Sequence, residues 1–531
     1  MSFDGCTLKD GVFWDANTKN IVGFASDVYT NIDLGDATRA FVRSASAGGS
    51  ELAPKIEDVP VAKTYMVFYL SFVDPKETFK IPIARYCITK STASFLAAVV
   101  PEIISAAYTY GFTTLGIVSD GAAENRAAMS SLATIPASYF LHSMVHKKIR
   151  VKDKKRRWPG FRDGVVERVI SFNKVEVLYD TGDDEGGEDR EELDLEVTEH
   201  TWMKPANYHK SKLHEHIDFE KMIAFAHPID PDEVVFIWQD MPHVMKRAVN
   251  VLERSNPRNE HRCSLRIYDE HGVAETMCLE MIRDVWEAFG GGGMSSLRFN
   301  KLTLEHFVKN AFNRMRVPLA LQVISKSVAD MLREAMRTNL LPGAKALGSL
   351  IKICLKLDRL VDILNGAGQE KRAPIINSPH HDTLYEALDI LGWFGDWKHD
   401  LEARELDLEI NFLNSELWQD LSGMILSFVC TCRHHLTQFP ESSVCQRRGQ
   451  QDVVEHHFGH LRDAAGSGRA VTAWAACSGT AKAAGTRIAR AGGNCSATKE
   501  INNDPLPGVS RRKEKAAKRK KKRASKKRKK K

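Results

Sequence analysis

The sequence predicts a mixed α/β sheet flanked by helices and interrupted twice, first by a small β-barrel-like insertion and then by a large all-α insertion. Strand-like and helix-like segments alternate over residues 4–132, the order expected of a mixed sheet. Residues 255–439 follow a helical pattern almost throughout. The last 21 residues hold 16 Lys and Arg residues, and such a segment cannot form a core.

The first part of the α/β domain is predicted to span residues 1–146. Two short apolar runs flank Asp15-Ala16-Asn17-Thr18, which is a hairpin signal. Three further strands are expected at 64–73, 80–89 and 115–120, and two helices from Ser91 or Thr92 onward and at 123–132. The spacing of apolar residues predicts the buried face of the first helix: Phe95, Val99, Ile103 and Ala106.

Residues 147–199 interrupt that pattern with several short strands and a Tyr-Asp-x-Gly-Asp turn. This segment resembles a Tudor-like or related SH3-type barrel. Such barrels bind methylated lysine or arginine in an aromatic cage by cation–π attraction. The resemblance implies chromatin or histone tails as partners and a methyl-mark cage made of Trp158, Phe161, Phe172 and Tyr179. These aromatics equally suit the core of a small barrel, and a loosely folded insertion is the third interpretation.

The remaining boundaries follow from later changes of pattern. A strand at 233–238 leads into a helix that runs to about Arg254, and a final helix is expected at 450–464. The predicted segments are 200–254 for the continued α/β domain, 255–440 for the helical insertion, 441–491 for the last part of the α/β domain, and 492–531 for a disordered polybasic tail.

The net charge of +7 combines two regions of opposite sign. Residues 511–531 hold 16 basic residues and one acid, whereas the other 510 residues hold 59 basic and 67 acidic residues. The tail is typical of a nuclear localisation signal or a non-specific nucleic-acid arm, and a solvated tail without a specific role is the alternative. The candidate nucleic-acid contacts are Lys246 in the body and, in the tail, Arg511, Arg512, Lys518, Arg519, Lys520, Lys521, Lys522 and Arg523.

Composition also predicts the compartment. The ten cysteines form no paired framework, which suits a reducing environment. The first residues carry neither the basic region nor the apolar core of a signal peptide. No apolar run reaches membrane-spanning length. We therefore expect a soluble nuclear protein that does not bind a membrane.

Asp120 is the first candidate for chemistry. It ends a short apolar run, and Gly121 follows at once. In an α/β fold this places Asp120 at the carboxyl end of a buried strand, where functional groups gather. Asp-Gly after a strand is also ordinary turn chemistry. The choice depends on further carboxylates, because hard cations such as Mg²⁺ take oxygen ligands.

Five motifs, in order over about residues 1–465, resemble those of P-element and THAP-type transposases. They are Phe3-Asp4-Gly5-Cys6 with the hairpin after it, Asp120-Gly121-Ala122-Ala123-Glu124-Asn125, Pro242-His243-Val244-Met245-Lys246 with Asn250, the stretch from Lys301 to Ala329, and Gln451-Asp452-Val453-Val454-Glu455 with Phe458 and Arg462.

This resemblance implies an RNase H-like catalytic domain of the DDE type that cuts and joins DNA. Asp4, Asp120 and Glu455 would hold two Mg²⁺ or Mn²⁺ ions about 3.5–4 Å apart, with Asp452 as the ligand that competes with Glu455. The helical insertion of P-element transposase binds GTP, which makes GTP a further expected cofactor. The implied partners are transposon ends, target DNA and further copies of the chain.

Departures from the family's pattern bear on activity. Asp4 is the fourth residue, so the first strand is expected to be cut short and weakly paired. The zinc-coordinating THAP module and the coiled coil of the family do not precede Asp4, Val249 stands in place of an arginine, and Arg469-Ala470-Val471-Thr472 in place of Asn-Pro-Thr. Three hypotheses follow. The first is a DDE transposase core, possibly truncated, and the second is a catalytically inactive, domesticated protein that binds DNA or chromatin. The third is a nucleotide-binding regulatory protein built on the helical insertion.

Overall fold

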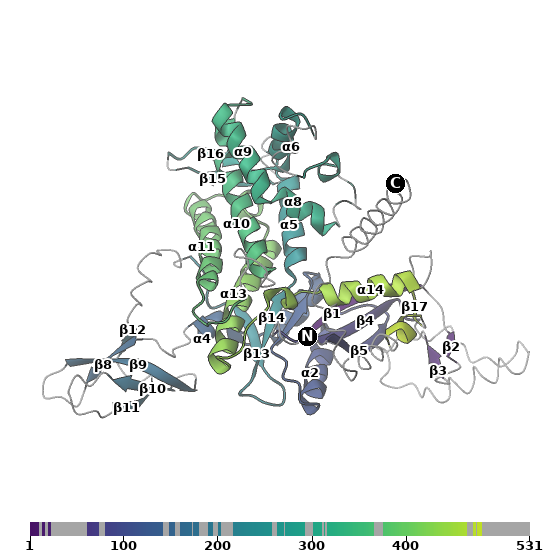
Figure 1. Ribbon diagram of the computed structural model, residues 1–531, viewed down its shortest axis with the longest axis vertical. Helices are drawn as coiled ribbons and strands as arrows, with labels where there is room; N and C mark the ends of the chain where they lie inside the picture. The colour runs from purple at the N-terminus through teal and green to yellow at the C-terminus, as the bar shows by residue number, and fades with distance from the viewer. Residues whose placement is uncertain are drawn as a thin grey trace, which may run out of the picture.

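An eight-stranded mixed sheet lies at the base of the molecule (Figure 1). Its order is β5-β4-β1-β6-β14-β13-β7, and β17 pairs with β1. The central strands β1, β6 and β14 are parallel, and β4, β5, β13 and β7 continue the sheet antiparallel on both sides. The strands are β1 (Ser2–Lys9), β4 (Thr64–Ser71), β5 (Lys80–Ile88), β6 (Gly116–Ser119), β7 (Ile135–Pro136), β13 (Met222–Ala226), β14 (Val234–Gln239) and β17 (Val471–Thr472).

The computed structural model describes most of the chain, with gaps. The described residues are 1–9, 13–15, 20–22, 61–73, 80–141, 148–153, 160–171, 174–179, 189–194, 200–202, 216–256, 263–269, 271–291, 301–308, 310, 313, 316–342, 344–365, 375–464, 471–473 and 475–480. The predicted hairpin is present within them as β2 (Phe13–Asp15) paired with β3 (Asn20–Val22). The polybasic tail lies outside the described residues.

The first strand is longer and better paired than the sequence predicted. β1 extends past Asp4 to Lys9, pairs with β4 from Ser2 to Thr7, and meets β6 at Ser2. The expectation of a short, weakly paired strand was wrong because it counted only the residues ahead of Asp4. The residues that follow Asp4 make most of the pairs.

Helices cover both faces of this sheet. On one face, α2 (Ala93–Thr109) and α3 (Ala123–Leu132) pack against Phe3, Phe68 and Ile117. On the other face, α14 (Asp452–Ala464) packs against the Cys6 side of β1. The predicted cap of α2 is Thr92, whose hydroxyl accepts a hydrogen bond from the Phe95 amide at 3.2 Å.

The buried face of α2 differs in part from the predicted one. Val99 and Ile103 are buried as expected, but Phe95 is half-buried and Ala106 is exposed. Leu96 and Ala107 are buried in addition. The helix therefore covers the sheet with a face turned slightly from the one that the spacing indicated.

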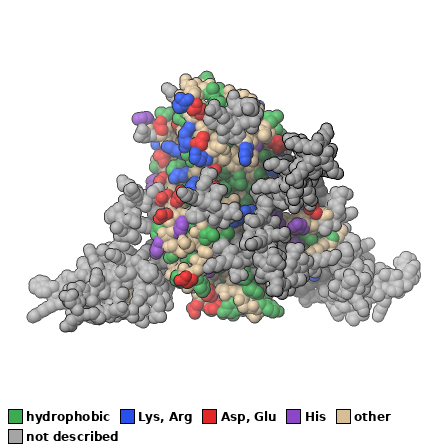
Figure 2. Space-filling model, in the orientation of Figure 1, with side chains coloured by type: hydrophobic (Ala, Val, Ile, Leu, Met, Phe, Trp, Pro, Cys, Tyr) green, Lys and Arg blue, Asp and Glu red, His purple; other side chains and the backbone are tan. Residues whose placement is uncertain are grey.

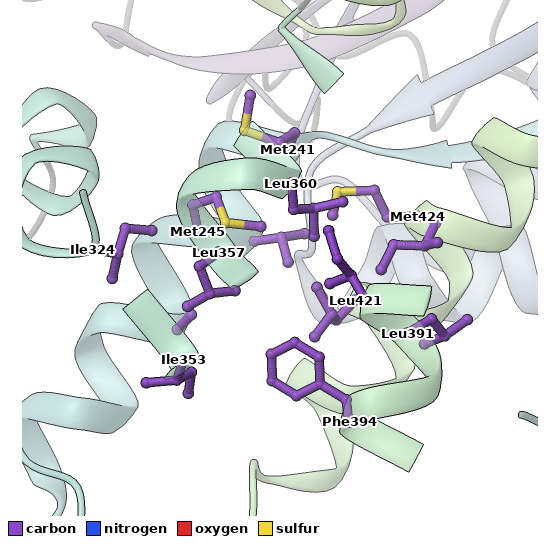
Figure 3. Close-up of a cluster of buried hydrophobic side chains, with 14 of the residues drawn as sticks. Met241, Met245, Ile324, Ile353, Leu357, Leu360, Leu391, Phe394, Leu421 and Met424 are labelled. Atoms are coloured by element: carbon purple, nitrogen blue, oxygen red, sulfur yellow. The ribbon is translucent and has the colours of Figure 1, made fainter. Parts of the chain in front are cut away.

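A helical region rises from the sheet (Figure 1) and includes the chain from α5 to α13. Side chains of α5, α10, α11 and α13 converge on one core, among them Met245, Leu357, Phe394 and Leu421 (Figure 3). The principal helices are α5 (Met241–Arg254), α6 (Leu279–Ala288), α8 (Val317–Val323), α9 (Lys326–Thr338), α10 (Gly348–Leu364), α11 (Asp382–Ala403) and α13 (Ser415–Gln438).

This region is not wholly helical, because β15 (Arg266–Tyr268) and β16 (Ala274–Thr276) form a small hairpin. Charged side chains of both signs are interspersed on the face of this region that Figure 2 shows. On α9, Asp330 contacts Lys326 and Arg333, and Glu334 contacts Arg337. This charge pattern is that of a solvated helix surface. None of the described helices is long and apolar enough to cross a membrane.

A separate five-stranded antiparallel sheet occupies the position of the predicted β-rich insertion (Figure 1). Its order is β11-β10-β9-β8-β12, so β11 and β12 stand at its two ends. Closure of this sheet into a barrel is not among the pairings of its described strands, and the barrel stays a prediction. The strands are β8 (Lys148–Asp153), β9 (Gly160–Ser171), β10 (Lys174–Tyr179), β11 (Asp189–Asp194) and β12 (His200–Trp202).

Candidate active site at the ends of the central strands

Three aspartates stand level at the three parallel strands: Asp4 lies within β1, and Asp120 and Asp240 directly follow β6 and β14. The register that pairs Ser2 with Val118 carries Asp4 to the level of Asp120. The register of β14 with β6 pairs Gln239 with Ser119, so Asp240 follows at the same level. The sheet topology therefore brings together three carboxylates from distant parts of the chain. This is the edge at which functional groups of parallel strands gather.

The surroundings of Asp4 strongly shift the pKa of its carboxyl group. Cys6 and Leu8 share its face of β1, since side chains alternate along a strand, and both pack in the same core cluster as Val454 and Phe458 of α14. The Gly5 amide donates to Asp4 Oδ1 at 2.7 Å. Burial first, and then the Asp120 carboxylate, raise the pKa of Asp4 from 3.8 to about 7. Near neutral pH this carboxyl therefore holds a proton or needs a nearby cation.

Asp120 is fixed at the start of α3. Its Oδ1 accepts hydrogen bonds from the Ala122 amide at 3.0 Å and from Asn125 Nδ2 at 2.5 Å. Asp120 thus makes the hydrogen bonds expected of an aspartate in a turn, but these bonds use only one of its two carboxylate oxygens. Asp120 and Asp4 also line the same cavity, of about 210 Å³. The interpretation of Asp120 as a turn residue is therefore compatible with its interpretation as a metal ligand.

Asp240 connects the sheet to α14, and the sequence interpretation did not propose it as a site residue. It is only 2% exposed. Its Oδ1 accepts from the Gln451 amide at 2.8 Å, and its Oδ2 lies 2.7 Å from His243 Nδ1. Gln451 Nε2 also donates to the Phe3 carbonyl at 2.6 Å. The signal that marks Asp240 is the one that marks Asp120, an aspartate directly after a buried strand.

Glu455 lies in the first turn of α14, immediately beyond this anchor. Its side chain is exposed, yet partial desolvation, and next the Asp240 carboxylate, raise its pKa. The Glu455 charge acts in turn on Asp4. The competing candidate Asp452 lies 3.6 Å from Arg447 Nε. Of the two, Glu455 is the one whose charge acts on Asp4.

Two basic side chains of α5 face the same group of acids. The His243 and Lys246 charges both act on Glu455, and His243 also acts on Asp4. Burial is the largest influence on His243 and opposes its protonation, but the hydrogen bond to Asp240 and the negative charges of Asp240 and Glu455 together outweigh it and raise the pKa of His243. The predicted nucleic-acid contact Lys246 therefore lies beside the carboxylates.

The residue types at this edge fit a hard divalent cation, because the donors are carboxylate oxygens. Burial first, and then the Asp120 charge, raise the pKa of Asp4, and a nearby cation would offset both effects. Within the described part of the chain, no three His, Cys, Asp or Glu side chains are close enough to hold one ion jointly. The described arrangement is a cleft that Asp4, Asp120 and Glu124 line together with uncharged residues, and Glu455 is not among its lining residues. The roles of Asp4, Asp120 and Glu455 as metal ligands stay predictions.

The other predicted site residues are placed only in part. Trp158 and Phe172 of the predicted cage lie outside the described residues. Phe161 and Tyr179 lie on β9 and β10, strands that pair with each other. The tail residues from Arg511 to Arg523 lie outside the described residues as well.

Comparisons with known proteins match two separate parts of the chain. Residues 1–133 match the family described as TNP-like, RNase H N-terminal domain, and residues 258–374 match the TNP-like, GTP-binding insertion domain. The solved structure of the Drosophila P element transposase strand transfer complex is similar, with a TM-score of 0.56 and 15% identity. The match covers 93% of this chain and 77% of that one, and at this identity it shows the fold. No curated protein matches the chain.

Proposed function

Because this chain is a P element transposase-like (TNP-like) protein with an RNase H N-terminal domain and a GTP-binding insertion domain, we propose that it is a DDE-type DNA transposase core. Its reaction is the cleavage and joining of DNA strands by phosphoryl transfer. The observation that carries the proposal is the register that sets Asp4 level with Asp120, with Glu455 on a helix anchored at the same edge.

The proposed roles follow from the surroundings of each residue. Asp4, Asp120 and Glu455 would hold Mg²⁺ or Mn²⁺, and the ion would supply positive charge to offset the charge that develops on the transferred phosphoryl group. Asp240 keeps α14 in place, since it accepts the hydrogen bond of the Gln451 amide. Lys246 attracts DNA phosphates toward the cleft. The solved relative is a P element transposase strand transfer complex, and strand transfer is the joining step of the reaction that we propose here.

The test is strand cleavage and transfer on DNA with the element's inverted repeats, in Mg²⁺ or Mn²⁺. We expect Asp120→Ala and Glu455→Ala each to lose more than about 100-fold in rate, since each removes a charge-stabilising group. Asp452→Ala is the matched control from the same helical turn and should keep its activity. Activity that survives in either of the first two variants contradicts the proposed roles.

The competing hypothesis, an inactive domesticated protein, predicts DNA binding without metal-dependent cleavage. The wild-type chain therefore separates the two hypotheses before any variant is made. Binding that persists in a folded chain with no cleavage in either metal would favour the inactive protein.

We also propose GTP as the ligand of the insertion domain, on the basis of the family match over residues 258–374. Titration calorimetry with GTP tests this, and ATP is the control. We further propose that residues 511–531 direct the chain to the nucleus, on the basis of their charge. A fluorescent fusion that remains cytoplasmic with the tail present contradicts that assignment.

A further inference from the structure

A cluster of four charged side chains lies directly beside the loop that holds Asp120. Arg126 comes from α3, Arg247 from α5, and Glu416 and Asp420 from α13. Two of these helices, α3 and α5, begin just after the strands that carry Asp120 and Asp240. The third, α13, belongs to the predicted helical insertion. The cluster is thus a junction between the insertion and the candidate active site.

Asp420 is the centre of this cluster. It is 2% exposed, and a buried carboxylate needs cationic or hydrogen-bonding partners. Arg247 Nη1 donates to Asp420 Oδ2, and Arg126 Nη1 lies 3.5 Å from the same oxygen. The exposed Glu416 contacts the outer nitrogens of both arginines, at 3.0 and 3.2 Å. Two guanidinium groups are therefore held by the buried Asp420 and, on the exposed side, by Glu416.

The cluster reaches Asp120 through Gly121. Arg126 Nη1 donates to the Gly121 carbonyl, and the neighbouring Asn125 donates to Asp120 Oδ1. The fit is close, since a methyl group on Gly121 would lie 2.6 Å from Arg247 Nη1 and 2.7 Å from Asp420 Oδ2. The backbone that follows Asp120 is thus packed directly against the paired charges.

We propose that Asp420 is a positioning residue for Asp120. Through Arg126 and Arg247, it holds the Gly121 backbone and the first turn of α3, and so fixes the direction in which the Asp120 carboxylate points. The helical insertion thereby sets the geometry of the cleft through α13. The effect of Asp420 on catalysis rests on the proposed DDE activity. The structural link, by which Asp420 holds the Gly121 backbone through Arg126 and Arg247, does not.

The structural link is tested by amide hydrogen exchange of the full chain, without metal or DNA. In Asp420→Asn, we expect the Ala122 and Arg126 amides, which donate to Asp120 Oδ1 and to the Ala122 carbonyl, to exchange at least about tenfold faster, since the loop opens locally. The matched control is Asp330→Asn, which removes an acid that also contacts two basic side chains but lies on α9. Unchanged exchange at these amides in a folded Asp420→Asn chain overturns the proposal.

A second variant keeps the link falsifiable if Asp420→Asn does not fold. Arg126→Met keeps the aliphatic part of the side chain and loses the guanidinium group, with the two nitrogens that contact Gly121, Asp420 and Glu416. The Arg126 side chain is 18% exposed. The variant should show the same faster exchange. A fully protected Gly121 loop in this variant would also overturn the proposal.

The catalytic consequence is measured as the Mg²⁺ dependence of cleavage. In Asp420→Asn, we expect kcat to fall roughly 10- to 100-fold, the scale of a small misplacement of a reacting group. The Mg²⁺ concentration for half-maximal rate should rise, whereas KM for DNA should stay unchanged. Lower stability alone reduces the active fraction and leaves the Mg²⁺ midpoint unchanged.

Asp420→Glu tests whether the negative charge at this position is what matters, because it restores the charge that Asp420→Asn removes. We expect it to recover part of the lost rate and of the shifted Mg²⁺ midpoint. An unchanged midpoint in Asp420→Asn overturns the positioning role. If the wild-type chain does not cleave DNA in either metal, the proposed function fails, while the exchange experiment still decides the link.

Discussion

At the scale of single residues, the three level aspartates differ through their surroundings. Asp240 is buried and uses both carboxylate oxygens in hydrogen bonds. Asp120 uses Oδ1 for its turn and lines the cavity. Asp4 has a pKa raised to about 7, by burial first. The same residue type thus serves as an anchor in one place and as a candidate metal ligand in the other two.

His434 provides a prediction about acid stability. It is half-buried on α13, with its ring centroid 5.6 Å from those of Phe140 and Phe236. Burial, and then the neighbouring His435, lower the pKa of His434 from 6.5 to about 4. Because the unfolded chain binds this proton more readily, stability is lost as pH falls from about 6.5 toward 4. A shift of this size corresponds to about 3 kcal/mol.

The measurement is urea unfolding of wild type and His434→Gln at pH 7 and at pH 4. Other groups also titrate in this range, so the informative quantity is the difference in unfolding free energy between the two proteins. We expect that difference to move in favour of His434→Gln by about 3 kcal/mol at the lower pH. His271→Gln, at an exposed position, is the control. A difference that does not depend on pH would show that His434 is not the sensitive group.

Candidate residues were predictable from the sequence to different degrees. Asp120 was found because a strand, an aspartate and a glycine follow one another. Glu455 needed the family resemblance, since helix spacing alone does not separate it from other acids. Asp240 has the same strand-end signal as Asp120 and was overlooked. Its partners are the Gln451 amide and His243, and the first of these lies 211 residues away.

At the scale of elements, long segments with clear periodicity were predicted well. The helix at 123–132 and the strand at 80–89 differ from α3 and β5 by at most one residue. The strands β7 and β13 and the hairpin of β15 with β16 were not foreseen. They are two to five residues long. Such short strands exist because a neighbouring strand pairs with them, and local sequence carries little of that information.

Gly449 tests how tightly the start of α14 is fitted to the sheet. A methyl group at this position would lie 1.5 Å from the indole ring of Trp238. The indole is held in place, because Trp238 Nε1 donates to Thr431 Oγ1 at 2.8 Å. We expect Gly449→Ala to lose about 3 kcal/mol of unfolding free energy through overpacking. Cleavage should fall as well, because Glu455 moves with α14.

Gly459→Ala is the control for this substitution. Gly459 lies in the middle of α14 and has no atom within 4 Å of the added methyl group. Alanine favours the helix over glycine, so this variant should gain about 0.5–1 kcal/mol. Urea unfolding of both variants gives the comparison. A Gly449→Ala chain as stable as wild type would show that α14 moves freely against Trp238.

At the scale of the whole molecule, the cleft depends on contacts between the most distant parts of the sequence. The hydrogen bond from Gln451 to the Phe3 carbonyl joins residues 448 positions apart. Between them the chain forms a β-rich insertion and the helical region (Figure 1). Strand order and register are fixed by such long-range packing. Local patterns predicted an α/β domain with two insertions, and the register that sets Asp4 level with Asp120 required the structure.

The uneven charge of the chain leads to the last prediction. Residues 511–531 carry a net charge of +15, and the remainder carries −8. Each phosphate that a basic side chain neutralises adds about 0.9 to the slope of log affinity against log salt. Deleting 511–531 should therefore weaken DNA binding at low salt and flatten this slope. Fluorescence anisotropy over a series of salt concentrations measures both quantities.

A milder variant tests whether the tail acts through individual charges. Replacing Lys520, Lys521, Lys522 and Arg523 by glutamine should reduce the slope by at most about 4, since it removes four potential phosphate contacts. Lys246→Gln, in the body beside the cleft, is the comparison and should change the slope by at most about 1. If the slope stays the same after deletion of the whole tail, DNA binding is carried by the folded body despite its negative net charge.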